Sequence, residues 1–355
     1  MSVISLISYV LTKVAVTVYA GGLVFQQVFG IKELWGIDFF WIAAIGLVIL
    51  TALYTIFGGM KSVLYTSILQ TPILLLGSLI ILVLGFKELG GWDEMMRICG
   101  AVTVNDYGNT MTELIRSNND PNFPWLGALI GSAIIGFWYW CTDQHIVQRV
   151  LGQSKGEAND VVMKRARRGS IAAGYFKILP VFMFLIPGMV AAALAAKGEF
   201  DMSNTDAAFA VMVKDVLPAG VKGIVTIGFI CALVASLAAF FNSCATLFTE
   251  DFYKPMCKGK SEATYVLVGR IATVVVVILG MAWIPIMMSL GSLYDYLQGI
   301  QSLLAPAMVA VFALGIFSKR ITPKAGEVGM IVGFIIGMVR LLTNIFTNTL
   351  SLIHI

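Results

Sequence analysis

Charged residues are scarce in this chain of 355 residues, and their scarcity indicates its class. Asp, Glu, Lys and Arg make up 12% of the residues, whereas 58% are hydrophobic and the mean hydropathy is +0.88. A soluble domain carries about 25% charged residues because its surface must face water. The composition therefore excludes ordinary water-soluble packing and indicates a chain whose solvent is lipid.

Histidine and cysteine are also rare, which excludes several kinds of site. The two histidines, His145 and His354, cannot build a metal cluster, and the five cysteines show no CxxC spacing. The chain has no HExxH, no GxSxG and no P-loop GxxxxGK[ST] motif. No basic patch with interleaved aromatic residues is present, so a nucleic-acid partner is not expected. We expect neither an enzyme nor an organic cofactor.

Long apolar stretches are what the sequence has instead. Runs of about 20 residues, enough to cross about 30 Å of hydrocarbon, recur about nine times. They are too long for strands and lack period-two alternation, so we expect an all-α transmembrane bundle forming one domain over 1–355. The predicted spans are 3–29, 38–58, 62–86, 125–148, 170–196, 221–248, 264–289, 293–317 and 325–347.

Basic residues indicate the orientation of these spans, because they favour cytoplasmic loops. They follow the fourth, sixth and eighth spans, in the segments 149–168, 254–260 and 319–324, whereas 87–124 carries mainly acidic residues. We therefore expect the three basic segments and the N-terminus inside the cell, and 87–124 and the last residues outside. This pattern predicts a multi-pass protein of the plasma or inner membrane.

Polar side chains inside the spans are costly in lipid and are therefore functional candidates. In the fourth span, the run FWYWCTDQHIVQR places Tyr139, Trp140 and Asp143 together. It is either an interfacial aromatic belt or the lining of a cavity. Aromatic rings beside carboxylate and amide groups are suited to sugars, because sugar C–H faces stack on rings and sugar hydroxyls pair with polar groups.

The fifth and eighth spans carry further candidates. Lys177 precedes Pro180 in the fifth span, where it either reaches the cytoplasmic interface or faces a cavity. In the eighth span, helical spacing places Tyr294, Gln298 and Gln301 on one face. Such an amide stripe indicates a cavity lining or hydrogen bonding between helices.

The first and sixth spans contribute a charge and several hydroxyl groups. Lys13 is one of the few charges in the first span and has no obvious partner in the sequence. The sixth span is rich in small residues, which usually indicate close helix packing. Ser236 and Thr246 also offer oxygens suited to a hard cation such as Na⁺.

At these stretches the sequence resembles the sodium/solute symporter family, and within it the sodium–glucose cotransporter branch. WYWCTDQ and FNS-x-ATLFT-x-D-x-Y carry the resemblance most specifically. The matching stretches, in the right order, are 52–71, 138–149, 174–189, 236–253 and 294–306. The resemblance implies a LeuT-like bundle of two inverted five-helix repeats with the solute near the membrane midplane. On that basis we expect the first two core helices and the C-terminal helices to be absent from this sequence.

The resemblance also implies roles for single residues near the sugar. Asp143, Lys177 and Gln298 match sugar contacts of the family. Tyr139 and Trp140 match aromatic neighbours of the sugar, and Tyr294 matches a gate on the extracellular side.

For sodium, the resemblance implies a site at the carbonyl of Ala232 and the hydroxyl of Ser236. Ala235 stands where family members commonly have a second serine, which would weaken this site. Ser67 stands where many members have an aspartate, so a second sodium site is not expected and a 1:1 coupling is favoured.

The sequence therefore predicts symport of a glucose-like or galactose-like sugar, with Na⁺ as the coupling ion and the lipid bilayer as surroundings. One alternative is a sodium-coupled importer of another polar solute, such as myo-inositol or a sialic acid. The other is a membrane sensor of the same fold that does not transport.

Overall fold

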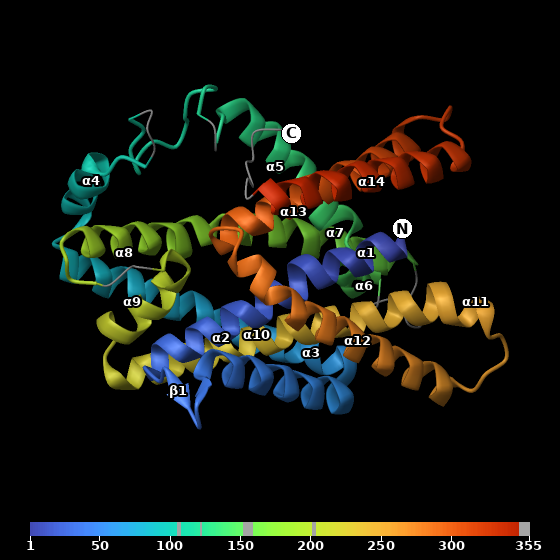
Figure 1. Ribbon diagram of the computed structural model, residues 1–355, viewed down its shortest axis with the longest axis horizontal. Coiled ribbons are helices and arrows are strands. Elements are labelled where there is room, and N and C mark those ends of the chain that lie inside the picture. The colour runs from blue at the N-terminus through green and yellow to red at the C-terminus, as the bar shows by residue number, and fades with distance from the viewer. Residues whose placement is uncertain (105–107, 121–122, 152–158, 201–203, 348–355) are drawn as a thin grey trace. The chain divides into compact units, whose positions relative to one another are not determined.

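The computed structural model describes residues 1–104, 108–120, 123–151, 159–200 and 204–347, without the side chains of 56–63, 69, 344 and 347, and most of this part is helical (Figure 1). The α-helices are α1 Ser2–Ser8, α2 Ala15–Phe29, α3 Phe39–Leu89, α4 Trp92–Ala101, α5 Trp125–Phe137, α6 Gln144–Leu151, α7 Asn159–Phe176, α8 Ile186–Ala196, α9 Ala208–Val216, α10 Ala219–Phe248, α11 Lys254–Met256, α12 Glu262–Met288, α13 Leu293–Phe317 and α14 Pro323–Thr347. The π-helices are η1 Tyr9–Val14, η2 Trp138–Thr142, η3 Val181–Leu185 and η5 Thr249–Tyr253, and η4 Thr205–Ala207 is a 3₁₀ helix.

Eight helices in the described part are long and apolar enough to cross a membrane, and a further apolar segment, Phe39–Thr55, is shorter. The predicted span 62–86, and the span 38–58 apart from its first residue, lie in α3. Within α3, the hydroxyls of Tyr54 and Thr66 are hydrogen-bonded to each other. Twelve residues of a straight helix rise about 18 Å, so the chain bends sharply between these two residues. The predicted spans are therefore two segments of one bent helix.

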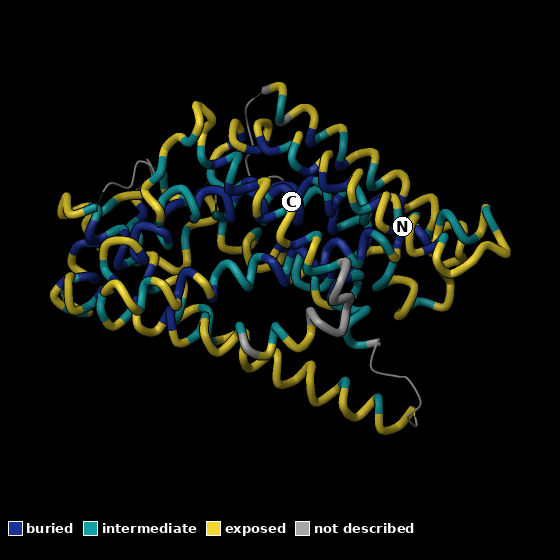
Figure 2. Tube along the Cα trace, turned by 90° about the horizontal axis from the view of Figure 1, so that it is seen from below, coloured by how far each residue is buried: buried dark blue, intermediate teal, exposed yellow. Residues whose placement is uncertain are grey.

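Apolar side chains cover the outer face of the helices, as expected where lipid is the solvent. In α12, Leu267, Ile271 and Ile278 are each more than half exposed, whereas Ala272 and Val276 are buried. Helical spacing places the two sets on opposite faces. Figure 2 shows long stretches of exposed residues along the helices, which in water would be an aggregating surface.

The chain divides into two compact units. Unit 1 consists of Met1–Thr17, Arg116–Leu151 and Ala239–Ile355. In it α13 and α14 pack closely. At Gly337 of α14 a Cβ would lie only 2.4 Å from the carbonyl oxygen of Leu303 in α13, so only glycine fits there. A small core around Trp138 and Met308 joins α5 and η2 to this helix pair.

Unit 2 consists of Val18–Ile115 and Gly152–Ala238. Its core packs α3, α4, α8 and α9 around fully buried side chains such as Ile81, Leu194 and Met212. The prediction of one domain over 1–355 stays a prediction.

Unit 2 also contains a short hairpin that the sequence analysis did not predict. Strands β1 (Glu33–Leu34) and β2 (Ile37–Asp38) pair antiparallel. Trp35 and Gly36 form the turn with φ of 56° and 74°, which is the backbone of a tight two-residue hairpin turn. The hairpin lies between the predicted spans 3–29 and 38–58, apart from Asp38, the first residue of the second span.

The basic segment after the fourth span is more regular than predicted. Helix α7 carries Lys164, Arg165, Arg167 and Arg168, and none of its residues is buried. The prediction of a loop is therefore wrong for 159–168, and Lys155 lies outside the described residues. A turn at Lys177 and Ile178 follows α7, just before Pro180, whose ring and missing N–H disfavour a continued helix.

Candidate functional site

The first membrane helix is irregular in unit 1. Tyr9–Val14 form the π-helix η1, and such a local widening changes the partners of the backbone carbonyls. The carbonyl of Leu11 accepts a hydrogen bond of 2.7 Å from the Tyr296 hydroxyl. That hydroxyl in turn accepts the indole N–H of Trp283 at 2.6 Å. Side chains of α12 and α13 therefore hold the irregular turn in place.

The fourth predicted span is interrupted at Asp143. Helix α5 continues into the π-helix η2, Asp143 is extended with φ −73° and ψ 127°, and α6 begins at Gln144. The Asp143 carbonyl accepts the N–H groups of Ile146 and Val147 at 3.1 and 3.0 Å. Its carboxylate accepts the N–H of His145 at 3.3 Å, so Asp143 caps α6. The prediction of an unbroken span over 125–148 is wrong at this residue.

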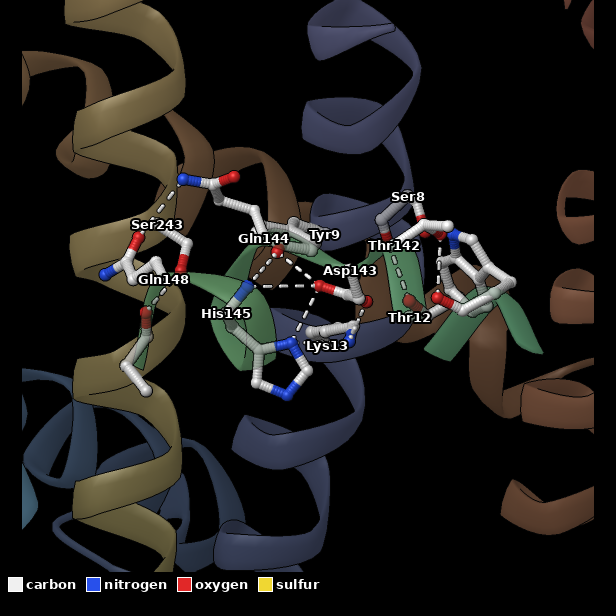
Figure 3. Close-up of polar contacts among 12 residues, drawn as sticks. Ser8, Tyr9, Thr12, Lys13, Thr142, Asp143, Gln144, His145, Gln148 and Ser243 are labelled. Atoms are coloured by element: carbon white, nitrogen blue, oxygen red, sulfur yellow. Dashed lines mark hydrogen bonds and ion pairs between the residues drawn. The ribbon is translucent and has the colours of Figure 1, made fainter. Parts of the chain in front are cut away.

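A buried ion pair connects η1 to this break. Lys13 Nζ lies 2.5 Å from Asp143 Oδ2, and the two side chains are only 4% and 1% exposed (Figure 3). Oδ1 of Asp143 accepts the Tyr9 hydroxyl at 2.5 Å and lies 2.7 Å from His145 Nδ1. Since a buried charge needs a partner, each member of the pair accounts for the other. Lys13 thus has the partner that the sequence analysis did not find.

Aromatic rings enclose the ammonium group of Lys13. Its Nζ lies 4.5 Å from the ring centre of Tyr139 and between 5.3 and 5.5 Å from those of Tyr9, Phe240 and Trp138. Cations within about 6 Å of a ring face are attracted by the ring quadrupole. The pairing of a lone lysine and a lone aspartate in two apolar spans is the signal that sequence reasoning missed.

The predicted site residues of unit 1 fall into two groups. Tyr139 and Trp140 lie on η2 directly before Asp143, and Trp140 is 45% exposed. On α13 the amide of Gln298 donates to the Tyr294 hydroxyl at 3.0 Å, which confirms that the two share a face. Helix α13 packs against η2, so the two groups lie on neighbouring elements.

The other predicted residues, Lys177, Ala232 and Ser236, belong to unit 2. Lys177 is exposed at the turn after α7, and Ser236 is half-buried in α10 one turn from Ala232. Ala232 also lines a cavity of about 440 Å³ whose walls are mostly apolar. In the described part, no three His, Cys, Asp or Glu side chains gather as a metal site.

Known proteins resemble the chain in sequence. The sodium:solute symporter family model matches residues 1–333. The sodium/glucose cotransporter 1 of Ovis aries is 34% identical over 98% of this chain and 55% of its own length. The sodium/myo-inositol cotransporter 2 of Bos taurus is 35% identical over 96% and 52%. The chain spans about half the length of the curated relatives it matches.

A solved structure resembles the chain in fold. It is the substrate-bound outward-open state of a Na⁺-coupled sialic acid symporter, with a TM-score of 0.63 and 18% sequence identity. The similarity covers 96% of this chain and 77% of that one. It confirms the predicted all-α, LeuT-like transmembrane fold. Together with the family match over most of the sequence, it leads to one conclusion: the chain belongs to the sodium:solute symporter family.

Proposed function

We propose that this chain provides the core of a sodium-driven symporter for a sugar or a closely related polyol. The solute class is supported by relatives named for glucose and myo-inositol. The observation that carries the proposal is the helix break at Asp143. The buried ion pair of Asp143 with Lys13 fixes this break, and Tyr139 and Trp140 lie in the turn of helix just before it. Transport of this kind needs no covalent chemistry, because coupling is a difference in affinity between two states.

The proposed solute contacts in unit 1 are Tyr139, Trp140 and Gln298, with Tyr294 as the gate. The partly exposed ring of Trp140 offers an apolar face to the C–H groups of a sugar. Gln298 offers an amide that can both donate to and accept from hydroxyls. Asp143 contributes by positioning the turn, because Lys13, Tyr9 and His145 surround its two oxygens. Lys177, in unit 2, stays a predicted sugar contact.

The proposed coupling ion is Na⁺, at the Ala232 carbonyl and the Ser236 hydroxyl. The two residues are four apart in α10 and so lie on one face of it. Ala235 is 4% exposed beside them and adds no oxygen from its side chain. We therefore expect a weak affinity for sodium. Ser67, in place of the family's aspartate, favours one sodium ion for each solute molecule.

Uptake by the protein in liposomes tests this proposal. Labelled glucose, myo-inositol and a sialic acid are offered in Na⁺, K⁺ and choline media at two pH values. We expect accumulation of a sugar or polyol that depends on a sodium gradient. Accumulation that follows the pH gradient and ignores sodium would refute the coupling ion. Solute binding without any uptake would instead favour a sensor.

Two substitutions test the solute contacts. Gln298→Ala should raise the half-saturating solute concentration, since a group that pairs with hydroxyls is lost at about 1–3 kcal/mol. Lys177→Ala should act in the same direction. The matched control is Gln26→Ala, which removes an amide of α2 that donates to Asp38 and is not among the proposed contacts. The site assignment is wrong if neither Gln298→Ala nor Lys177→Ala changes solute binding.

A further inference from the structure

Three polar groups meet in a closed triangle beside the break in the fourth span. Asp143 contacts Lys13 through Oδ2 at 2.5 Å and His145 Nδ1 through Oδ1 at 2.7 Å. The third side joins Lys13 Nζ to the same His145 Nδ1 at 3.1 Å. Figure 3 shows one ring nitrogen of His145 turned to Asp143 and the other turned away. One imidazole nitrogen therefore contacts both a cation and an anion.

The protons available cannot satisfy all three contacts at once. If Nδ1 of a neutral His145 carries the proton, it donates to Asp143, but it then faces the ammonium of Lys13, which is also a donor. If Nδ1 is bare, it accepts from Lys13, but its lone pair then faces a carboxylate oxygen. The shorter contact favours the first arrangement. Lys13 and His145 then both donate to Asp143, and a second proton on His145 would go to Nε2.

The charges around the triangle oppose that second proton. Lys13 and Asp143 cancel, so a protonated His145 would leave a net positive charge among side chains that are at most 5% exposed. A net charge in such surroundings is costly. The other titratable or charged groups around the cluster are Tyr9 of η1, Tyr139 of η2, Arg149 of α6 and Cys244 of α10. None of these supplies a second negative charge at neutral pH.

We propose that His145 is a proton-binding site that replaces Lys13 as the counter-cation of Asp143. While Lys13 lies on Asp143, His145 stays neutral. When η1 moves away from the break, Asp143 keeps a buried negative charge, and His145 takes up a proton from solvent to balance it. Acidification therefore favours the separated arrangement. All three groups lie in unit 1.

Nuclear magnetic resonance of labelled histidine tests this site directly. The chain has two histidines, so His354→Gln leaves His145 as the single signal in the protein. We expect the His145 ring to take up its proton at a lower pH than an ordinary histidine when Lys13 is present. Lys13→Gln should raise the proton affinity of His145 at least about tenfold, which is one pH unit. Lys13→Arg, which keeps the cation, should leave His145 neutral.

Equal titration midpoints for the protein with Lys13 and for Lys13→Gln would overturn the proposal. If Lys13→Gln does not fold, the protein with Lys13 still decides, because a midpoint at or above the ordinary value of about 6.5 overturns it as well. Unfolding experiments give a second readout. His145 binds a proton more readily in the unfolded chain than in the folded chain. The free energy of unfolding should therefore fall as pH drops below about 6.5. His145→Asn should remove this component, and His354→Gln should not.

Discussion

Lys13 and Asp143 are 130 residues apart in the sequence, yet Lys13 Nζ lies 2.5 Å from Asp143 Oδ2. The pair joins a π-helical turn of the first membrane helix to the break in the fourth. Neither element would be stable in lipid with a lone charge. The pair therefore explains why two charges persist inside apolar spans.

Breaking this pair from one side should be strongly destabilising. At a pH where His145 is neutral, Lys13→Met leaves a buried carboxylate without its cation, at a cost of about 3–5 kcal/mol. Lys13→Met combined with Asp143→Asn should cost less than Lys13→Met alone, because no unpaired charge remains. Thermal or denaturant unfolding in detergent measures both. As a control, Arg97→Met breaks the exposed pair with Glu94 and should cost far less, because water screens exposed charges. Equal costs for the two single variants would contradict the role of burial.

The aromatic enclosure around Lys13 should accept a free cation once the side chain is shortened. In Lys13→Ala, n-propylammonium supplies an ammonium and most of the missing methylenes. We expect millimolar n-propylammonium to raise the unfolding temperature of this variant and not that of the unchanged protein. 1-Propanol, which is close in size but neutral, is the control. Equal effects of the two compounds would show that the enclosure recognises volume and not charge.

The tyrosine that holds η1 should matter more than its neighbour on the same helix. Tyr296→Phe removes the donor to the Leu11 carbonyl and the acceptor of the Trp283 N–H. We expect a loss of about 1–3 kcal/mol, because buried polar groups lose their partner. Tyr294→Phe changes a hydroxyl on a side chain that is 56% exposed and should cost much less. A similar loss for both would argue that α13 does not support the π-helical turn.

Labelling with a thiol reagent that cannot cross the membrane tests the predicted orientation. Leu114 is 93% exposed in the segment expected outside, and Asp160 is exposed in the basic segment expected inside. In a background with Cys141→Ser, Leu114→Cys and Asp160→Cys should react from opposite sides. Reaction of both from one side would refute the orientation based on basic residues.

The sodium proposal predicts opposite effects for two adjacent residues of α10. Ser236→Ala removes the proposed hydroxyl ligand and should abolish sodium dependence of uptake. Ala235→Ser adds an oxygen and should lower the sodium concentration needed for half-maximal uptake. Thr246→Ala, on the same helix, removes a hydroxyl that bonds the Asn242 carbonyl and should change neither. Sodium titrations of uptake in liposomes distinguish the three, and an unchanged response in Ser236→Ala would make that residue a packing residue.

Local pattern was sufficient for much of the architecture. Apolar length predicted most of the helices, since crossing lipid requires about 20 residues whatever their neighbours are. Helical spacing placed Tyr294 and Gln298 on one face, and the structure joins them by a hydrogen bond. The family motifs around Trp138 and Phe241 indicated the fold that the comparisons confirm.

The sequence by itself determined that the chain is helical, embedded in lipid and of this family, because composition and local spacing express those properties residue by residue. Only the tertiary structure decided that Lys13 pairs with Asp143, that His145 completes the cluster and that the fourth span breaks there. These features depend on which helices pack together. An apolar run has the same sequence pattern whether it forms a regular α-helix or a helix with a π-helical turn. The difference arises from contacts with residues far away in the chain.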